Sequence, residues 1–161
     1  MKIKRITEME VERNQLQAGD KITLGEAEWK VLEVKDGKAL IWKCTKIEGH
    51  VFNENNSNVY EGSDIQKYLQ TEFPETVPVN ILDDVTEEGF FLLTVDQIRK
   101  YMPKELDRIA TDENDQTTWY WTASPFVGSG RSVRVVGTDG YISINNAGYS
   151  FGVAPACWIH L

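Results

Sequence analysis

The fold is decided by residues 28–44, which read EWKVLEVKDGKALIWKC. Residues 28–34 and 39–44 are rich in the β-branched, aromatic and aliphatic side chains that are typical of strands. Between them, Lys35-Asp36-Gly37-Lys38 contains the Asp-Gly pair that supplies the positive φ angles of a tight turn. The stretch therefore predicts a β-hairpin, and residues 21–24 predict one more strand before it.

Two helices are predicted further along, each opened by a capping residue. Ser63 precedes the first with Gln66 at the capping-box position, and Thr94 precedes the second with Gln97 at the same position. Apolar residues then recur at helical spacing and define a buried face. These faces contain Ile65, Tyr68 and Leu69 in the first helix, and Val95, Ile98 and Met102 in the second. Pro103 starts a third short turn or helix.

Strand patterns occupy most of the remaining chain. They cover residues 90–93, 119–122, 132–136, 141–145 and 153–159, whereas 49–58 and 111–118 read as polar loops. Strands on both sides of short central helices indicate an α+β fold with mainly antiparallel sheet and two to three short helices. The length of 161 residues suits a single domain, which we place at 19–161, after an N-terminal extension over 1–18.

Charge is distributed unevenly along the chain. The net charge is −8, yet residues 119–161 hold only Arg131, Arg134 and Asp139 among the charged types. The acidic remainder repels polyanions, so we expect neither nucleic acid nor a membrane as a partner. No apolar run is long enough to span a bilayer and no secretory signal is visible, which predicts a cytoplasmic location.

Metal, cofactor and nucleophilic chemistry find little support. Cys44, His50, Cys157 and His160 do not have the spacing of a zinc site, so we expect two free buried thiols and no metal or cofactor. The acidic run at residues 112–115 lacks the EF-hand pattern and is interpreted as a solvated loop.

One enzymatic alternative stays open. A carboxylate-dependent hydrolase or transferase using Asp112, Asp115 and Asp139 would need a concave pocket and an acid whose pKa is displaced toward neutrality.

The C-terminal quarter has the composition of a recognition surface. It is nearly uncharged and rich in Gly, Asn, Ser and aromatic residues, as binding surfaces often are. In Trp119-Tyr120-Trp121 the two tryptophans share one strand face, which leaves Tyr120 as the exposed member if the tryptophans are core. We predict a ligand-binding surface, for a glycan or a protein, built from Tyr120, Arg131, Arg134, Tyr141, Asn145, Asn146 and Tyr149.

An ordered series of short motifs resembles a bacterial domain family of unknown function that is common in gut bacteria and their prophages. The motifs run over residues 25–32, 38–41, 60–65, 68–69, 72–73, 90–94, 119–125 and 152–159, and so extend over about residues 19–161. The family is similar to C-type-lectin-like folds, in which the C-terminal β region often displays the ligand surface. Where its members usually carry arginine, this chain has Ala123 and Ala154.

The resemblance implies a non-enzymatic binding module, associated with a virion if a phage encodes the chain. The calcium-dependent lectin motifs are absent, so the resemblance implies no calcium-dependent sugar binding. A structural or assembly subunit is the remaining alternative, and the sequence leaves the oligomeric state open.

Overall fold

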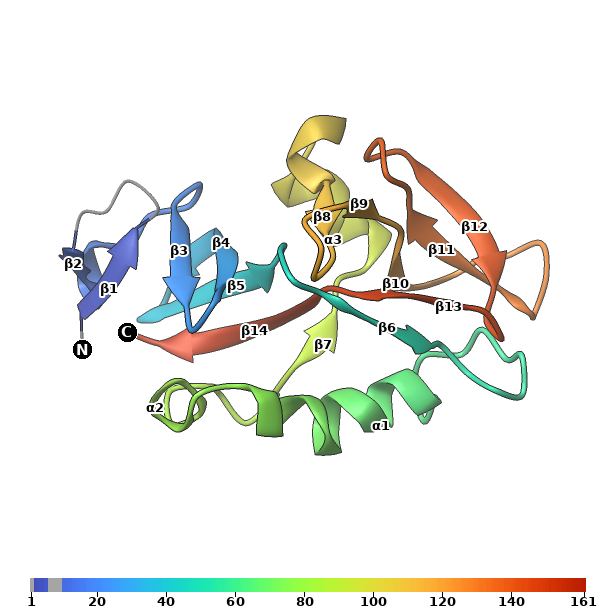
Figure 1. The fold of residues 1–161 in the computed structure, drawn as a ribbon, viewed down its shortest axis with the longest axis horizontal. Coiled ribbons are helices and arrows are strands. Elements are labelled where there is room, and N and C mark those ends of the chain that lie inside the picture. The colour runs from blue at the N-terminus through green and yellow to red at the C-terminus, as the bar shows by residue number, and fades with distance from the viewer. Residues whose placement is uncertain (1, 6–9) are drawn as a thin grey trace.

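The computed structural model describes residues 2–5 and 10–161, which form two main sheets and short helices (Figure 1). The seven-stranded sheet contains, in spatial order, β2 (Glu10–Glu12), β1 (Lys2–Arg5), β3 (Lys21–Leu24), β4 (Ala27–Lys35), β5 (Lys38–Lys43), β14 (Pro155–His160) and β7 (Phe91–Leu92). The five-stranded sheet contains β12 (Ile142–Asn146), β11 (Ser132–Val136), β10 (Tyr120–Pro125), β13 (Ser150–Val153) and β6 (Glu48–Val51). A small ribbon pairs β8 (Ala110–Thr111) with β9 (Thr117–Thr118).

The helices are short and lie in the central part of the chain. The α-helices are α1 (Asp64–Thr71), α2 (Val79–Leu82) and α3 (Val95–Tyr101), and the 3₁₀ helices are η1 (Arg13–Gln15), η2 (Phe73–Thr76) and η3 (Glu105–Arg108). The paired strands are antiparallel except β10 and β13. The predicted α+β class with mainly antiparallel sheet is therefore confirmed.

The β4–β5 hairpin forms where the sequence predicts it. Asp36 and Gly37 have φ angles of 52° and 73°, as the two central residues of a type I′ turn require. Residues of β5 alternate between two hydrophobic clusters, because Ala39 and Ile41 belong to one and Leu40 and Trp42 to the other. The strand is buried on both faces, which explains its continuous apolar run.

Both predicted capping residues begin their helices. The Ser63 side chain accepts a hydrogen bond from the Gln66 backbone, and Thr94 forms a full capping box with Gln97. α1 and α2 cover one side of the sheets and α3 covers the other, as Figure 1 shows. Each helix thus closes one of the two clusters, with Leu69 in the first and Ile98 in the second.

Two segments differ from the sequence prediction. Residues 153–159 form no single strand, because β13 ends at Val153 in one sheet and β14 begins at Pro155 in the other. Residues 48–51, which overlap the start of the predicted polar loop 49–58, form β6 through antiparallel pairing with β13. The partner lies about a hundred positions away in sequence, so no local hydrophobic pattern was needed to make this strand.

The described part of residues 1–18 joins the domain. β1 pairs with β2 and with β3, and Leu16 is buried in the first cluster. The Arg13 guanidinium donates to Asp84, and it reaches the carbonyl oxygen of His160 at 3.3 Å. Both ends of the described chain therefore lie at the same end of the molecule (Figure 1). Within the described residues, no helix is both long enough and apolar enough to cross a membrane.

Candidate functional site

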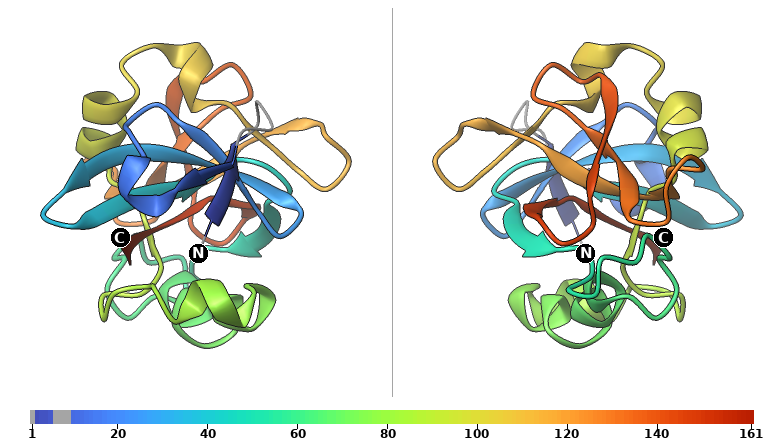
Figure 2. Two further views of the ribbon diagram at one scale, coloured as in Figure 1. Left: turned by 90° about the vertical axis from the view of Figure 1, so that its left-hand side faces the viewer. Right: turned by 90° about the vertical axis from the view of Figure 1, so that its right-hand side faces the viewer.

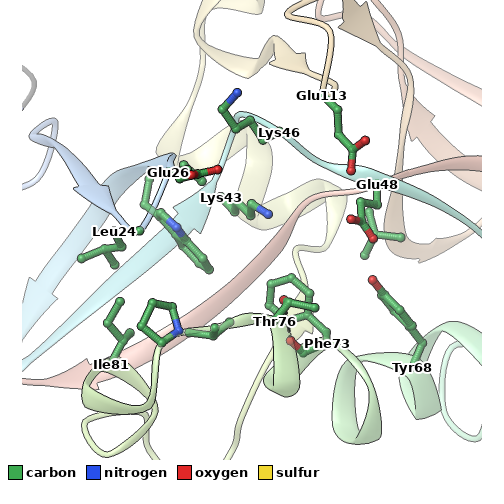
Figure 3. A pocket seen from close by; sticks show the side chains of 16 residues that line it. Leu24, Glu26, Lys43, Lys46, Glu48, Tyr68, Phe73, Thr76, Ile81 and Glu113 are labelled. Carbon is green, nitrogen blue, oxygen red and sulfur yellow. Dashed lines mark hydrogen bonds between the residues drawn. The ribbon is translucent and has the colours of Figure 1, made fainter.

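A cavity of about 520 Å³ lies between the β3–β6 region and the α1–α2 layer (Figure 3). This volume falls within the usual range of small-molecule sites. The charged side chains lie on the sheet side of the cavity, and the lining also contains hydroxyl groups, rings and aliphatic side chains (Figure 3). The polar lining is Glu26, Lys43, Lys46, Glu48, Tyr68, Thr76 and Glu113, and the apolar lining includes Leu24, Trp29, Phe73, Val77, Pro78, Ile81 and Val153.

A row of aromatic rings lies along the cavity floor. Phe73 contacts Phe90 edge-on at 4.9 Å between centroids, and Phe90 lies 6.5 Å from Trp29. At the other end, Tyr68 is 6.3 Å from Phe73 and stacks on His50 at 4.6 Å. Trp29 and Phe73 are almost fully buried, so only Tyr68 presents a substantial ring surface. The floor is therefore rigid and its accessible face is amphipathic.

The charged wall is assembled by the docking of a distant turn. Glu113 lies in the turn between β8 and β9, and that ribbon is attached to the β5–β6 connection by two backbone bonds. Ile47 donates to the Thr111 carbonyl at 3.1 Å, and Thr111 donates to the Cys44 carbonyl at 3.0 Å. These bonds place Glu113 beside Glu48, the first residue of β6 (Figure 3).

The two carboxyl groups interact directly. A side-chain hydrogen bond with Glu113, followed by desolvation and the like charge, raises the pKa of Glu48 above its usual value. The neighbouring carboxyl group thus disfavours ionisation of Glu48 within the cavity.

Lys43 stands between the charged wall and the aromatic floor. Its ammonium nitrogen is 5.6 Å from the Phe73 ring centroid, and it points across the cavity from the end of β5 (Figure 3). Burial lowers the pKa of Lys43, although Glu48 and Glu113 oppose the shift. A desolvated ammonium between a ring and carboxyl groups can donate hydrogen bonds to a ligand oxygen.

A smaller cavity of about 360 Å³ lies on the other side of the β4 strand, beside Lys30, Tyr101 and Asp107. Its polar groups already bond within the chain. The Lys30 ammonium donates to the Asp107 carbonyl at 2.6 Å, and the Tyr101 hydroxyl donates to Glu33. The larger cavity is therefore the stronger candidate.

The expectation that Tyr120 contributes to an exposed surface is wrong. Tyr120 is 1% exposed, and its hydroxyl donates to the Arg108 carbonyl at 2.5 Å. Trp121 is equally buried but belongs to the other cluster. β10 is a central strand covered on both faces, so its aromatic alternation marks two cores rather than a core and a surface.

The remaining predicted residues do not form one surface. Tyr141 and Tyr149 are each 60% exposed, but they flank opposite ends of β12, which is about 16 Å long at the usual strand rise. Arg134 pairs with Ile144 and Asn145 pairs with Val133, so Arg134 and Asn145 point to opposite faces.

One end of β12 does bring several predicted residues together. Ala147 donates to the Arg131 carbonyl at 2.8 Å, and Tyr149 donates to the Asn146 carbonyl at 3.1 Å. The side-chain oxygens of Asn145 and Asn146 accept bonds from the backbone of Asn146 and Gly148. These two amide oxygens hold a turn, so they are not free for a ligand.

The neighbouring β10–β11 loop is held by a residue that the sequence did not single out. The Asn58 side chain is buried, and its amide donates to the carbonyls of Phe126, Ser129 and Ser132 at 2.8–3.2 Å. Val127, at the tip of this loop, is 98% exposed. Figure 1 shows that this loop lies at the end of the molecule opposite to the chain termini.

The carboxylates proposed for an enzyme from sequence lie outside the cavity. Asp112 accepts from the backbone of Asn114 and Gln116, and Asp139 accepts from Tyr141. These acids, like Asp115, are absent from the cavity lining. Cys44 and Cys157 are free and buried, as predicted, and no cluster of three potential metal ligands occurs in the described part of the chain.

Residues 82–161 match the model of a protein family described as a domain of unknown function (DUF6273). The match supports the resemblance at the level of a domain of unknown function. Neither a curated protein nor a solved structure matches the chain. The matched segment contains all of β7 to β14 but only Glu113 and Val153 of the cavity lining. The cavity is therefore built mainly by residues that precede the matched segment.

Proposed function

We propose that the chain is a non-enzymatic ligand-binding module of the C-type-lectin-like kind, and that it binds a saccharide unit of a glycan in the large cavity. The observation that carries the proposal is the pairing of an aromatic floor with a charged wall in about 520 Å³. Sugars present both an apolar ring face and a rim of hydroxyl groups, so they match such a two-sided site. The resemblance to a prophage domain family adds the setting, a cell or virion surface.

Tyr68, Lys43 and the Glu48–Glu113 pair each have a role in this proposal. Tyr68 offers its ring to the apolar face of the sugar, with its hydroxyl pointing toward Glu48 (Figure 3). Lys43 donates to a sugar oxygen, and the carboxylate of the Glu48–Glu113 pair accepts from a sugar hydroxyl. The exposed residues Arg131 and Tyr149 at the far end of the five-stranded sheet provide a separate surface for a protein ligand.

The test is a saccharide panel screened against the whole chain, followed by calorimetric titration of the best binder. Tyr68→Ala and Lys43→Met should each weaken binding about tenfold, because losing one charged hydrogen bond or one stacked ring costs roughly 1.5 kcal/mol. Tyr149→Ala is the matched control, since this tyrosine is exposed and lies outside the cavity lining. Unchanged affinity in both cavity variants, or loss of binding in Tyr149→Ala, would move the site to the distal surface.

A carboxylate-dependent hydrolase is the second candidate, and the Glu48–Glu113 pair favours it. Two neighbouring glutamates in a cavity, one of them with a raised pKa, can supply a proton donor and a proton acceptor, as general acid–base chemistry needs. Turnover of a bound saccharide by the wild type, abolished in Glu48→Gln, would establish the enzyme over the binding module.

A further inference from the structure

β12 is an edge strand whose outer side has no partner within the described chain. It ends the five-stranded sheet, and its inner side pairs with β11 along its whole length. In Figure 2 the β11–β12 hairpin lies at the front of the right-hand view, with no element covering it. The backbone groups on the outer side of this strand are therefore available for pairing.

The hydrogen-bond pattern of the hairpin shows which groups point outward. Gly137 donates to the Tyr141 carbonyl and Ala147 donates to the Arg131 carbonyl, each at 2.8 Å. Because inward and outward residues alternate in an antiparallel pair, odd-numbered residues of β12 face β11. Ile142, Ile144 and Asn146 then point their N–H and C=O groups away from the sheet.

Only two of these three residues can accept a new strand. The Asn146 N–H already donates to the Asn145 side chain at 2.9 Å, and its carbonyl accepts from Tyr149 at 3.1 Å. No hydrogen bond occupies the outward groups of Ile142 and Ile144 in the described chain. The free edge is therefore a short, well-defined unit centred on Ser143.

The side chains of this strand give it none of the usual protection of an edge. Residues 141–146 contain no charge and no proline, and Ile144 is 38% exposed. The opposite edge of the same sheet, β6, carries Glu48 and contacts α1. At the edges of the other sheet, β2 carries two glutamates and β7 has only two residues. Among the described edges, β12 is thus the one most suited to pairing.

We propose that β12 pairs antiparallel with β12 of a second copy of this chain, about a two-fold axis through Ser143. Ile142 then lies opposite Ile144 of the second copy, and the reverse pair follows by symmetry. The two pairs exchange about four backbone hydrogen bonds and cover the isoleucine side chains. The second copy is favoured over an extended peptide because the outward groups are self-complementary in this register.

The charge distribution also favours a second copy of the chain as the partner of β12. The chain has a net charge of −8, so two copies repel each other over most of their surfaces. Residues 131–149, which contain the hairpin, hold only Arg131, Arg134 and Asp139, so the hairpin itself adds little to the repulsion of a second acidic copy. The paired strand itself brings no like charges together. Added salt screens the remaining repulsion and should strengthen the dimer.

The first test is sedimentation equilibrium of the whole chain between about 5 µM and 1 mM, at low and at moderate salt. A monomer–dimer equilibrium is expected, and a monomer over the whole range would overturn the proposal. Ile144→Pro removes one outward N–H without touching the bonds to β11, and a proline is tolerated on such an edge. It should remain folded by circular dichroism and become monomeric. Ile144→Lys should do the same, whereas Val34→Lys on the interior strand β4 should dimerise normally.

A cross-link tests the register directly. Ser143 sits at the non-hydrogen-bonded position on the two-fold axis, where Cα atoms are about 4.5 Å apart and a disulfide can form. Ser143→Cys should form a covalent dimer under mild oxidation, and Thr138→Cys in the exposed turn should not. The native cysteines are buried and do not interfere. Equal cross-linking of both variants, or dimers that persist in Ile144→Pro, would contradict the β12 pairing. Capture of a strand-forming peptide by the monomeric chain would instead assign this edge to another partner.

Discussion

The cavity draws its walls from segments spread between Leu24 and Val153, whereas the β11–β12 hairpin is one stretch of residues 132–146. The cavity gathers three glutamates and two lysines, and the hairpin strands carry a single charge, on Arg134. In the cavity, charge depends on docking: Glu48 meets Glu113 only because a small ribbon binds the β5–β6 connection. In the hairpin, the proposed strand pairing depends on register, which fixes the groups that face outward. A substitution that weakens the attachment of the ribbon can thus alter the cavity, whereas the edge of the hairpin changes only when residues of β12 itself are substituted.

The largest expected effect comes from the residue that joins these two regions. Trp121 is 1% exposed. Its ring centroid lies 5.4 Å from that of Phe52 and 5.1 Å from that of Phe151. Its indole N–H donates to the His50 carbonyl at 2.9 Å. Trp121→Ala should lower the free energy of unfolding by about 3–5 kcal/mol, because it leaves a cavity and an unpaired carbonyl. Urea denaturation measures the change. A loss below about 1 kcal/mol would mean that the two regions do not share a core.

A pair of glycine variants tests whether the β11–β12 hairpin depends on contacts with the rest of the molecule. Gly140 and Gly37 both have positive φ, at 84° and 73°, and each is the last residue of the turn in its hairpin. A Cβ at Gly140 would lie 1.9 Å from the Glu105 carbonyl oxygen, whereas one at Gly37 meets nothing within 4 Å. Gly37→Ala should cost about 1 kcal/mol and Gly140→Ala about 2–4 kcal/mol in unfolding experiments. Equal costs would show that the β11–β12 turn does not depend on its contact with the η3 segment.

The loop before the hairpin depends on one buried amide. Asn58→Ala removes the donor for the carbonyls of Phe126, Ser129 and Ser132. The variant should lose about 1–3 kcal/mol of stability, since three hydrogen bonds to the loop are removed at a buried position. Hydrogen exchange should rise in residues 126–132 and stay unchanged around the cavity. Asn55→Ala, at an exposed position in the same connection, serves as the control and should have no effect.

The smallest effect is expected from charge in the cavity. The folded pKa of Glu48 is raised above its unfolded value, so its contribution to stability is present below the unfolded pKa and is lost as the pH rises through the folded pKa. Glu113→Gln removes the like charge and should lower the pKa of Glu48. Its melting temperature should match that of the wild type near pH 4 and exceed it by about 1–2 °C at pH 7. Glu88→Gln is the control, and the same pH profile in both variants would rule out the interaction.

Sequence reasoning succeeded where the determinants of structure are local. The Asp36-Gly37 turn, the Ser63 and Thr94 caps and the β11 strand could all be predicted, because each depends on residues a few positions apart. The exposure of Tyr120 could not, because alternation along a strand does not reveal whether both faces are covered.

The candidate site was beyond sequence reasoning for a related reason. Glu113 stood out only as one acid in the run 112–115, where the residue pattern suggested a solvated loop. What places it in a cavity is the bridge from its ribbon to Ile47, a pairing across about sixty positions. Trp29 and Phe73 carried a hydrophobic signal, but nothing indicated that they would underlie the same hollow.

The passage of the chain from β13 in one sheet to β14 in the other affects the order in which the sheets can form during synthesis. β13 separates β6 from the rest of its sheet, and β14 separates β7 from the rest of the other. Residues 150–160 therefore complete two sheets at once, and they are translated after all the strands that they join. A nascent chain that stops before residue 150 has neither sheet closed, so its apolar strands remain exposed. Closure of both sheets thus waits until residues 150–160 have been synthesised.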